Sequence, residues 1–94
     1  MIRVRAEVQG DKILEISISG DFFINPPKTV LELEKNLVGC RLDENEIVSK
    51  VSGVYRKLKV ESPGLSAEDF VEAIMKLKPL IEKSLGETKP YTRL

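Results

Sequence analysis

The 94-residue chain contains no histidine, no tryptophan and only one cysteine, Cys40. Without histidine it lacks the side chain that most often serves as a general base near neutral pH. A single cysteine can form neither an intrachain disulfide nor a cysteine-rich zinc site. A thiol nucleophile also needs a base beside it, so we interpret Cys40 as a small buried residue at a helix end. The sequence therefore disfavours catalysis by a histidine base or a thiol nucleophile and excludes a cysteine-rich zinc site.

An excess of charge of one sign is also missing, because 15 basic residues balance 15 acidic ones. Binding to nucleic acid generally requires a basic surplus that displaces counterions from the phosphates. Stacking on bases requires aromatic side chains, and the chain has only three phenylalanines and two tyrosines. Neither of the common glycine-rich phosphate-binding motifs is present. A nucleic-acid-binding domain is therefore the weakest of the functions that we consider.

No apolar run approaches the ~18 residues of a membrane span, and no signal peptide is visible, so we expect a cytoplasmic protein. The hydrophobic fraction of 41% and the charged fraction of 32% are ordinary for a folded domain. A chain of this length makes one domain with a thin core and little room for a deep cleft. We assign residues 1–86 to that domain and residues 87–94, which lack periodicity, to a flexible C-terminal tail.

Two segments near the N-terminus alternate between apolar and polar residues, which predicts a β-hairpin with a turn at Gly10-Asp11-Lys12. A two-residue loop would place the apolar residues of the two strands on opposite faces. A three-residue loop or an equivalent bulge brings them to one face. The predicted register pairs Val8 with Leu14, Ala6 with Ile16 and Val4 with Ile18.

Helical periodicity follows the hairpin. Asn25 before a proline predicts a helix start, and Gly39 predicts the end of that helix. Asp43 and Ser66 predict the starts of two further helices, because each is followed three positions later by an acidic residue, as in a capping box.

Two segments leave alternatives open. Residues 58–62 are either a third strand or a linker, and Pro79 either kinks the third helix or begins a fourth. The predicted fold class is α+β, with a small antiparallel sheet packed against three or four helices. A hairpin alone leaves two open edges, which are either covered by helices and loops or pair with a partner chain.

The order of these features resembles the C-terminal accessory domain of lipoate–protein ligases. The resemblance is carried by "ISGDFF" at residues 18–23, by the following helix "VLELEKNLVG", and by "LSAEDFVEAI" in the third helix. It covers roughly residues 1–78. In that family a large domain binds lipoate and ATP, forms lipoyl-adenylate and transfers the lipoyl group to a lysine of an acceptor protein.

The chain begins with Met1 directly before the first strand, and no catalytic domain precedes it. This resembles the archaeal arrangement, in which the two domains are separate polypeptides. The resemblance implies a non-catalytic subunit that forms a heterodimer with the large catalytic subunit and is required for activation of lipoate. It implies no catalytic, cofactor-binding or metal-binding residue in this chain, with ATP, Mg²⁺ and lipoate used by the complex.

We predict that the subunit docks through the polar face of its hairpin and the adjoining rim. The residues concerned are Arg3, Arg5, Ser17, Ser19, Asp21 and Phe23. Alternation places Phe22 in the core, whereas Phe23 either packs under the following helix or contacts the partner. Asp21 either bonds backbone amides at the end of the strand or faces the partner. The alternative function is a generic interaction module that uses a sheet edge.

Overall fold

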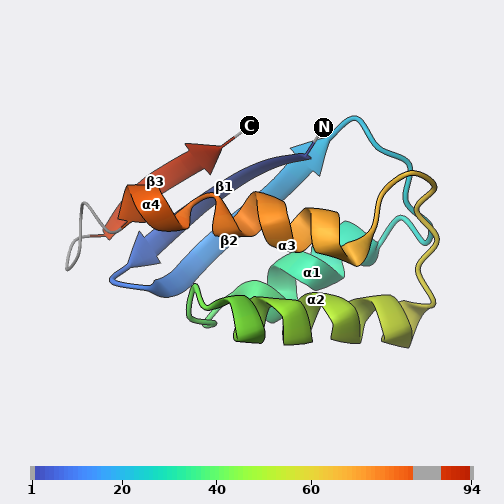
Figure 1. The fold of residues 1–94 in the computed structure, drawn as a ribbon, viewed down its shortest axis with the longest axis horizontal. Coiled ribbons are helices and arrows are strands. Elements are labelled where there is room, and N and C mark those ends of the chain that lie inside the picture. The colour runs from blue at the N-terminus through green and yellow to red at the C-terminus, as the bar shows by residue number, and fades with distance from the viewer. Residues whose placement is uncertain (1, 82–87, 94) are drawn as a thin grey trace.

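The computed structural model describes residues 2–81 and 88–93, and the side chains of residues 2–79. A three-stranded antiparallel sheet lies beside the helices (Figure 1). The elements in chain order are β1 (Ile2–Gln9), β2 (Lys12–Gly20), α1 (Thr29–Leu37), α2 (Glu44–Leu58), α3 (Ala67–Met75), α4 (Lys78–Ile81) and β3 (Thr88–Arg93). The predicted α+β class is confirmed.

The β1–β2 hairpin has the predicted register over most of its length. Val4 lies opposite Ile18 and Ala6 opposite Ile16, as expected. The apolar residues of both strands reach one face through a bulge rather than a three-residue loop, because Glu7 pairs with Glu15 and the next residue, Val8, pairs with Ile13. Leu14 is the extra residue on β2. The pairing of Val8 with Leu14 is therefore wrong: Ile13 is fully buried, and Leu14 is 38% exposed.

The third strand is β3, which pairs antiparallel with the free edge of β1 and gives the strand order β2-β1-β3. The prediction of a flexible tail over residues 87–94 is therefore wrong for residues 88–93. The alternative third strand at 58–62 is also wrong, because α2 continues to Leu58 and Glu61 forms only an isolated bridge with Asn25. Residue 87 and residue 94 lie outside the described residues.

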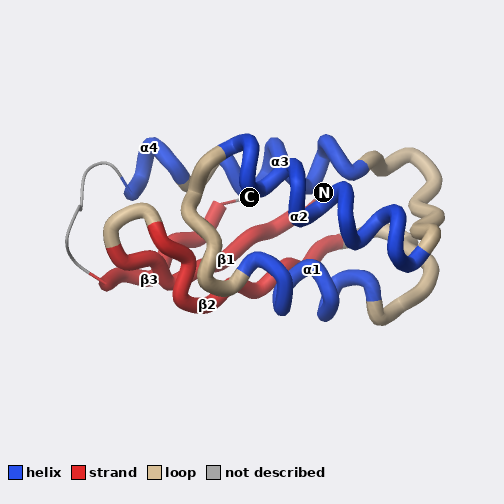
Figure 2. The backbone as a smooth tube through the Cα atoms, turned by 90° about the horizontal axis from the view of Figure 1, so that it is seen from below, coloured by secondary structure: helices blue, strands red, loops and turns tan. Residues whose placement is uncertain are grey.

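The helices cover one face of the sheet. Figure 2 shows α2 between α1 and α3, and α2 packs mainly against these two helices, whereas α1 contacts β2 and α3 contacts β1. One hydrophobic core joins the three helices to the sheet. Its fully buried side chains include Val4, Val8, Ile13, Leu33, Leu37, Ile47, Val51, Phe70, Ile74 and Leu77. The core leaves the other face of the hairpin to solvent.

Two of the predicted helix starts are confirmed. The Asp43 side chain accepts a hydrogen bond from the backbone N–H of Glu46, and Ser66 and Asp69 form a complete capping box. The prediction for Asn25 is wrong, because its backbone pairs with Glu61 at 2.8 Å in both directions. The first helix instead begins at Thr29, whose hydroxyl donates to the Pro26 carbonyl at 2.6 Å.

The outer edge of β2 is covered from within the chain. The Ile13 N–H donates to the Cys40 carbonyl, and the Gly39 N–H donates to the Ile13 carbonyl, both at 2.8 Å. Further along the strand, the Ile18 N–H donates to Glu34 Oε2 at 2.7 Å. Gly39 can enter this contact because its φ of +88° lies in the left-handed region. These bonds satisfy edge groups that would otherwise invite pairing with another chain.

The Glu34 carboxylate should therefore contribute to the stability of the fold. We expect Glu34→Ala to lower the free energy of unfolding by about 1–2 kcal/mol, because it leaves a partly buried backbone N–H without its charged acceptor. Glu34→Gln keeps an acceptor oxygen and should cost less. The control is Glu32→Ala on the same helix, which should change stability by less than about 0.5 kcal/mol. Urea unfolding measures all three; equal effects of Glu34→Ala and Glu32→Ala would contradict the assignment.

Candidate docking surface

The described part of the chain holds no cluster of three or more acidic, cysteine or histidine side chains that could bind a metal ion. Cys40 is only 8% exposed, and its thiol donates a hydrogen bond to the Asn36 carbonyl at 3.3 Å. Burial raises the pKa of the Cys40 thiol, although nearby Lys50 acts in the opposite direction. Because the thiolate is the reactive form, this environment suits the structural role predicted for Cys40.

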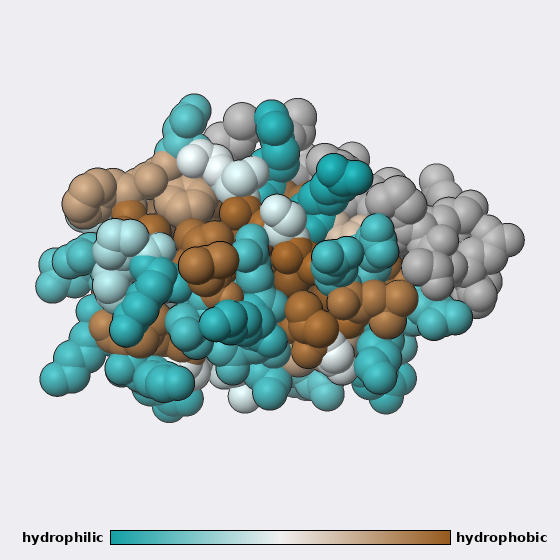
Figure 3. Space-filling view, turned by 180° about the vertical axis from the view of Figure 1, so that it is seen from behind, coloured by the Kyte–Doolittle hydropathy of each residue, from teal (hydrophilic) through white to brown (hydrophobic). Residues whose placement is uncertain are grey.

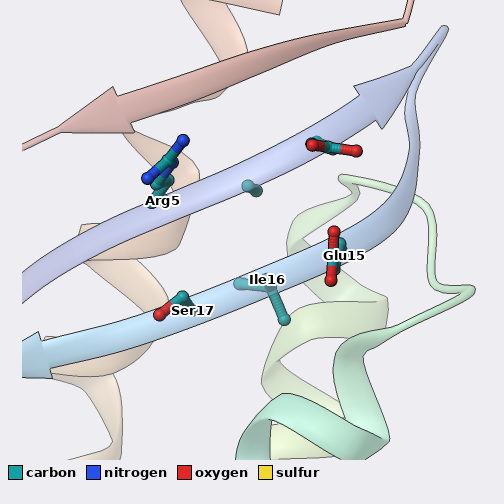
Figure 4. Close-up of a pocket in the computed structure, with 6 residues that line it drawn as sticks. Arg5, Glu15, Ile16 and Ser17 are labelled. Atoms are coloured by element: carbon teal, nitrogen blue, oxygen red, sulfur yellow. The ribbon is translucent and has the colours of Figure 1, made fainter.

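The solvent-facing side of the hairpin gathers four of the predicted docking residues. Arg3 lies opposite Ser19 and Arg5 opposite Ser17, and all four are exposed. Figure 4 looks onto this face, with the helices behind the strands. The alternation of the two strands thus delivers these polar groups to one surface, as the sequence predicts.

Two acidic residues that the docking prediction omitted extend this surface. Glu7 and Glu15 lie directly opposite each other, and both are exposed. Together with Arg5 and Ser17 they line a shallow depression of about 280 Å³ (Figure 4). We call the six residues Arg3, Arg5, Glu7, Glu15, Ser17 and Ser19 the open face. The alternation that predicts the arginines on this face also predicts the glutamates.

The rim at the end of β2 holds the two remaining predicted residues. Asp21 lines a small hollow with Arg3, Ser19 and Gly20, and within residues 2–79 its carboxylate makes no hydrogen bond. Phe23 is 72% exposed, so the alternative of packing under α1 is wrong. Phe22 packs against the core, with its ring edge-on to Phe70 at a centroid distance of 5.6 Å, as predicted.

Other apolar side chains are also exposed. The space-filling view in Figure 3 shows apolar side chains at the surface in patches broken by polar ones. Within residues 2–79, the exposed large apolar residues besides Phe23 are Leu14, Leu31, Val38 and Val48. Val48 belongs to a groove between α2 and α3, floored by Val71 and Met75 and rimmed by glutamates that include Glu68 and Glu72. Sequence reasoning named none of these four positions as a surface: it placed Leu14 in the hairpin core, whereas Val48 lies beside the buried stripe of α2 at Ile47 and Val51.

The fold and the surface together define a small binding domain with a one-sided sheet and no catalytic constellation within the residues described. The chain belongs to the family described as bacterial lipoate protein ligase C-terminus, whose model matches residues 1–74. The elements α4 and β3 lie beyond the matched residues.

Two comparisons place the chain near archaeal proteins. It is 35% identical over 75 residues to lipoate-protein ligase A subunit 2 of Thermoplasma acidophilum, a match that covers 79% of this chain and 76% of the relative. It also superposes with a TM-score of 0.71 on a chain from a structural study of an archaeal lipoylation system. That study describes a bi-partite lipoate protein ligase and its E2 lipoyl domain from the same organism. The identity is 36%, with 78% of this chain and 80% of that chain covered.

Among the helices that the structure describes, none is long and apolar enough to cross a membrane.

The buried thiol gives a prediction for the pH dependence of stability. Because burial raises the pKa of Cys40, the folded protein holds this proton at pH values where the unfolded chain releases it. The contribution of the protonated thiol to the free energy of unfolding is fully present below the ordinary thiol pKa of about 8.5, and it is lost as the pH rises above that value. Urea unfolding at about pH 7.5 and about pH 9.5 should show a smaller alkaline loss for Cys40→Ala than for the wild type. Equal losses of unfolding free energy in the variant and the wild type would contradict the assignment of this pH dependence to Cys40.

Proposed function

We propose that the chain is the non-catalytic accessory subunit of a two-part lipoate–protein ligase. With a large catalytic subunit it activates lipoate with ATP to lipoyl-adenylate, and so supports lipoylation of lysines in acceptor proteins. The observation that carries the proposal is the match to subunit 2 of the archaeal ligase over three quarters of both chains. The superposition on a chain of the bi-partite ligase supports it.

The chemistry is assigned to the large subunit. Mg²⁺ is usually held by one or two carboxylates together with substrate phosphates. In the proposed complex, ATP, Mg²⁺ and lipoate are used at a reaction centre on the large subunit. The accessory subunit contributes by docking: it orders loops around the reaction centre and keeps water from the mixed anhydride, which would otherwise hydrolyse.

The docking surface that we propose combines the open face with the rim at Asp21 and Phe23. Arg3 and Arg5 are exposed and form no ion pair within residues 2–79, where the only ion pair joins Arg41 to Asp11. Arginine is suited to pairing with carboxylates across an interface, because its planar fork offers several donors. An exposed phenylalanine such as Phe23 is typical of an interface anchor.

The alternative of a generic module that captures a strand on its sheet edge has less support. The edge of β2 is covered by Glu34, Gly39 and Cys40, so within the described sheet strand capture would have to use the outer edge of β3. A nucleic-acid-binding role would require an excess of basic residues, and this chain has equal numbers of basic and acidic residues. We propose that the complex is cytoplasmic.

The first test is lipoate-dependent exchange of pyrophosphate into ATP by the purified large subunit, with and without this chain. We expect neither protein to support exchange alone and the mixture to support it. Full activity of the large subunit alone, or an inactive mixture of two folded proteins that bind each other, would contradict the proposed role.

Substitutions on the docking surface should weaken the heterodimer without abolishing its chemistry. We expect Arg3→Ala with Arg5→Ala, or Phe23→Ala alone, to raise the Kd for the large subunit about tenfold or more, since interface anchors contribute about 1–4 kcal/mol. Exchange should recover at saturating concentrations of the variant. Arg56→Ala, an exposed arginine on α2, is the matched control and should leave Kd unchanged. A uniform loss for all variants would contradict a localised docking surface.

A further inference from the structure

Charges on the open face are ordered along the strands rather than mixed. The end where β1 begins carries Arg3 and Arg5, opposite the uncharged Ser19 and Ser17. The next cross-strand pair, Glu7 with Glu15, carries two negative charges. Along the strands the charge therefore changes from basic at Arg3 and Arg5 to acidic at Glu7 and Glu15, and Lys12 in the Gln9–Lys12 pair is basic again.

The Glu7–Glu15 pair is unfavourable in the isolated chain. Like charges directly opposite each other on antiparallel strands destabilise a sheet. On the other side of β1, the β3 residues in register with Arg5 and Glu7 are Thr92 and Pro90, which carry no charge. Lys12, in the following pair with Gln9, is the nearest basic position on β2.

Within residues 2–79 these charges form no ion pair. The only ion pair among residues 2–79 is that of Arg41 with Asp11, so neither Lys12 nor Arg5 forms an ion pair with the glutamates. Both glutamates border the same shallow depression on the solvent side of the sheet (Figure 4). Two carboxylates at one depression, exposed and unpaired, are ready to accept a positively charged group from outside.

We propose that the large subunit places a basic side chain, lysine or arginine, between Glu7 and Glu15, and acidic side chains against Arg3 and Arg5. The inference rests on the proposed function, since it takes the large subunit as the partner on this face. Opposite charges on the two surfaces would favour this contact over one that brings like charges together.

The occupant is a side chain rather than a metal ion. The described residues provide no third acidic, cysteine or histidine ligand near the two glutamates. A guanidinium or an ammonium group needs only two carboxylates to be well paired, and its donors can reach both strands.

The pair gives an unusual test, because stability and binding should respond in opposite directions. Glu15→Gln removes the repulsion with Glu7, so the free subunit should melt about 1–4 °C higher. The same change removes half of the acceptor for the partner's basic group, so the Kd for the large subunit should rise about three- to tenfold. If Glu15 had a purely structural role, its substitution would weaken both the fold and the complex, so the melting temperature would fall while Kd rose.

The experiment uses the full chain and the purified large subunit. Differential scanning calorimetry gives the melting temperature of the free subunit, and isothermal titration calorimetry gives Kd. The variants are Glu7→Gln, Glu15→Gln and the double Glu7→Lys with Glu15→Lys, for which we expect Kd to rise at least about a hundredfold. The control is Glu72→Gln, an exposed glutamate at the α2–α3 groove on the helical side, with no effect on Kd expected.

Two contrary results have different meanings. Wild-type Kd retained in the double lysine variant would overturn the charge-ordered contact and leave the accessory role standing, since the wild type would still bind and activate. No binding or activation by the wild-type chain would overturn the proposed function and this inference together. A higher Kd for Glu15→Gln accompanied by a lower melting temperature would also overturn the inference, because the pair would then stabilise the free fold.

Discussion

The register of the β1–β2 hairpin decides which side of this protein is buried. Side chains alternate along both strands, so a shift of one residue would exchange the core face with the solvent face. The bulge at Leu14 absorbs the odd residue and aligns Val8 with Ile13, while Val4 and Ala6 stay opposite Ile18 and Ile16. All of these apolar residues except Leu14 then meet the helices in one core. The helices that close the core, and the bonds from Glu34, Gly39 and Cys40 to the β2 edge, depend on that alignment.

The same register has a functional consequence on the opposite side. A sheet covered by helices on one face presents its other alternating residues to solvent, and here these are arginines, glutamates and serines. A charged, one-sided sheet suits a subunit that acts by binding, and the family to which the chain belongs is defined as one part of a ligase.

Local signals in the sequence predicted local structure well. The caps at Asp43 and Ser66 depend on residues three positions apart, and the hairpin register depends on simple alternation, so both could be predicted without tertiary information. The strand β3 could not, because its residues do not alternate, it contains Pro90, and it is held by pairing with β1 residues that lie 79 to 89 positions earlier. For the same reason the backbone bridge of Asn25 to Glu61 overrode its capping signal. The docking prediction named the arginines and Phe23, which the structure places at the surface, but it omitted Glu7 and Glu15, which the hairpin register brings opposite each other.

The central claim is that the open face, rather than the helical side, meets the large subunit. The most direct measurement is a set of ¹H–¹⁵N and methyl NMR spectra of the isotope-labelled chain, free and bound to the unlabelled large subunit. The account predicts that chemical-shift changes concentrate in β1, in β2 from Glu15 onward and at Asp21–Phe23, and leave Val48, Val71 and Met75 at the α2–α3 groove unchanged. Large changes at the groove with an unperturbed sheet would contradict it.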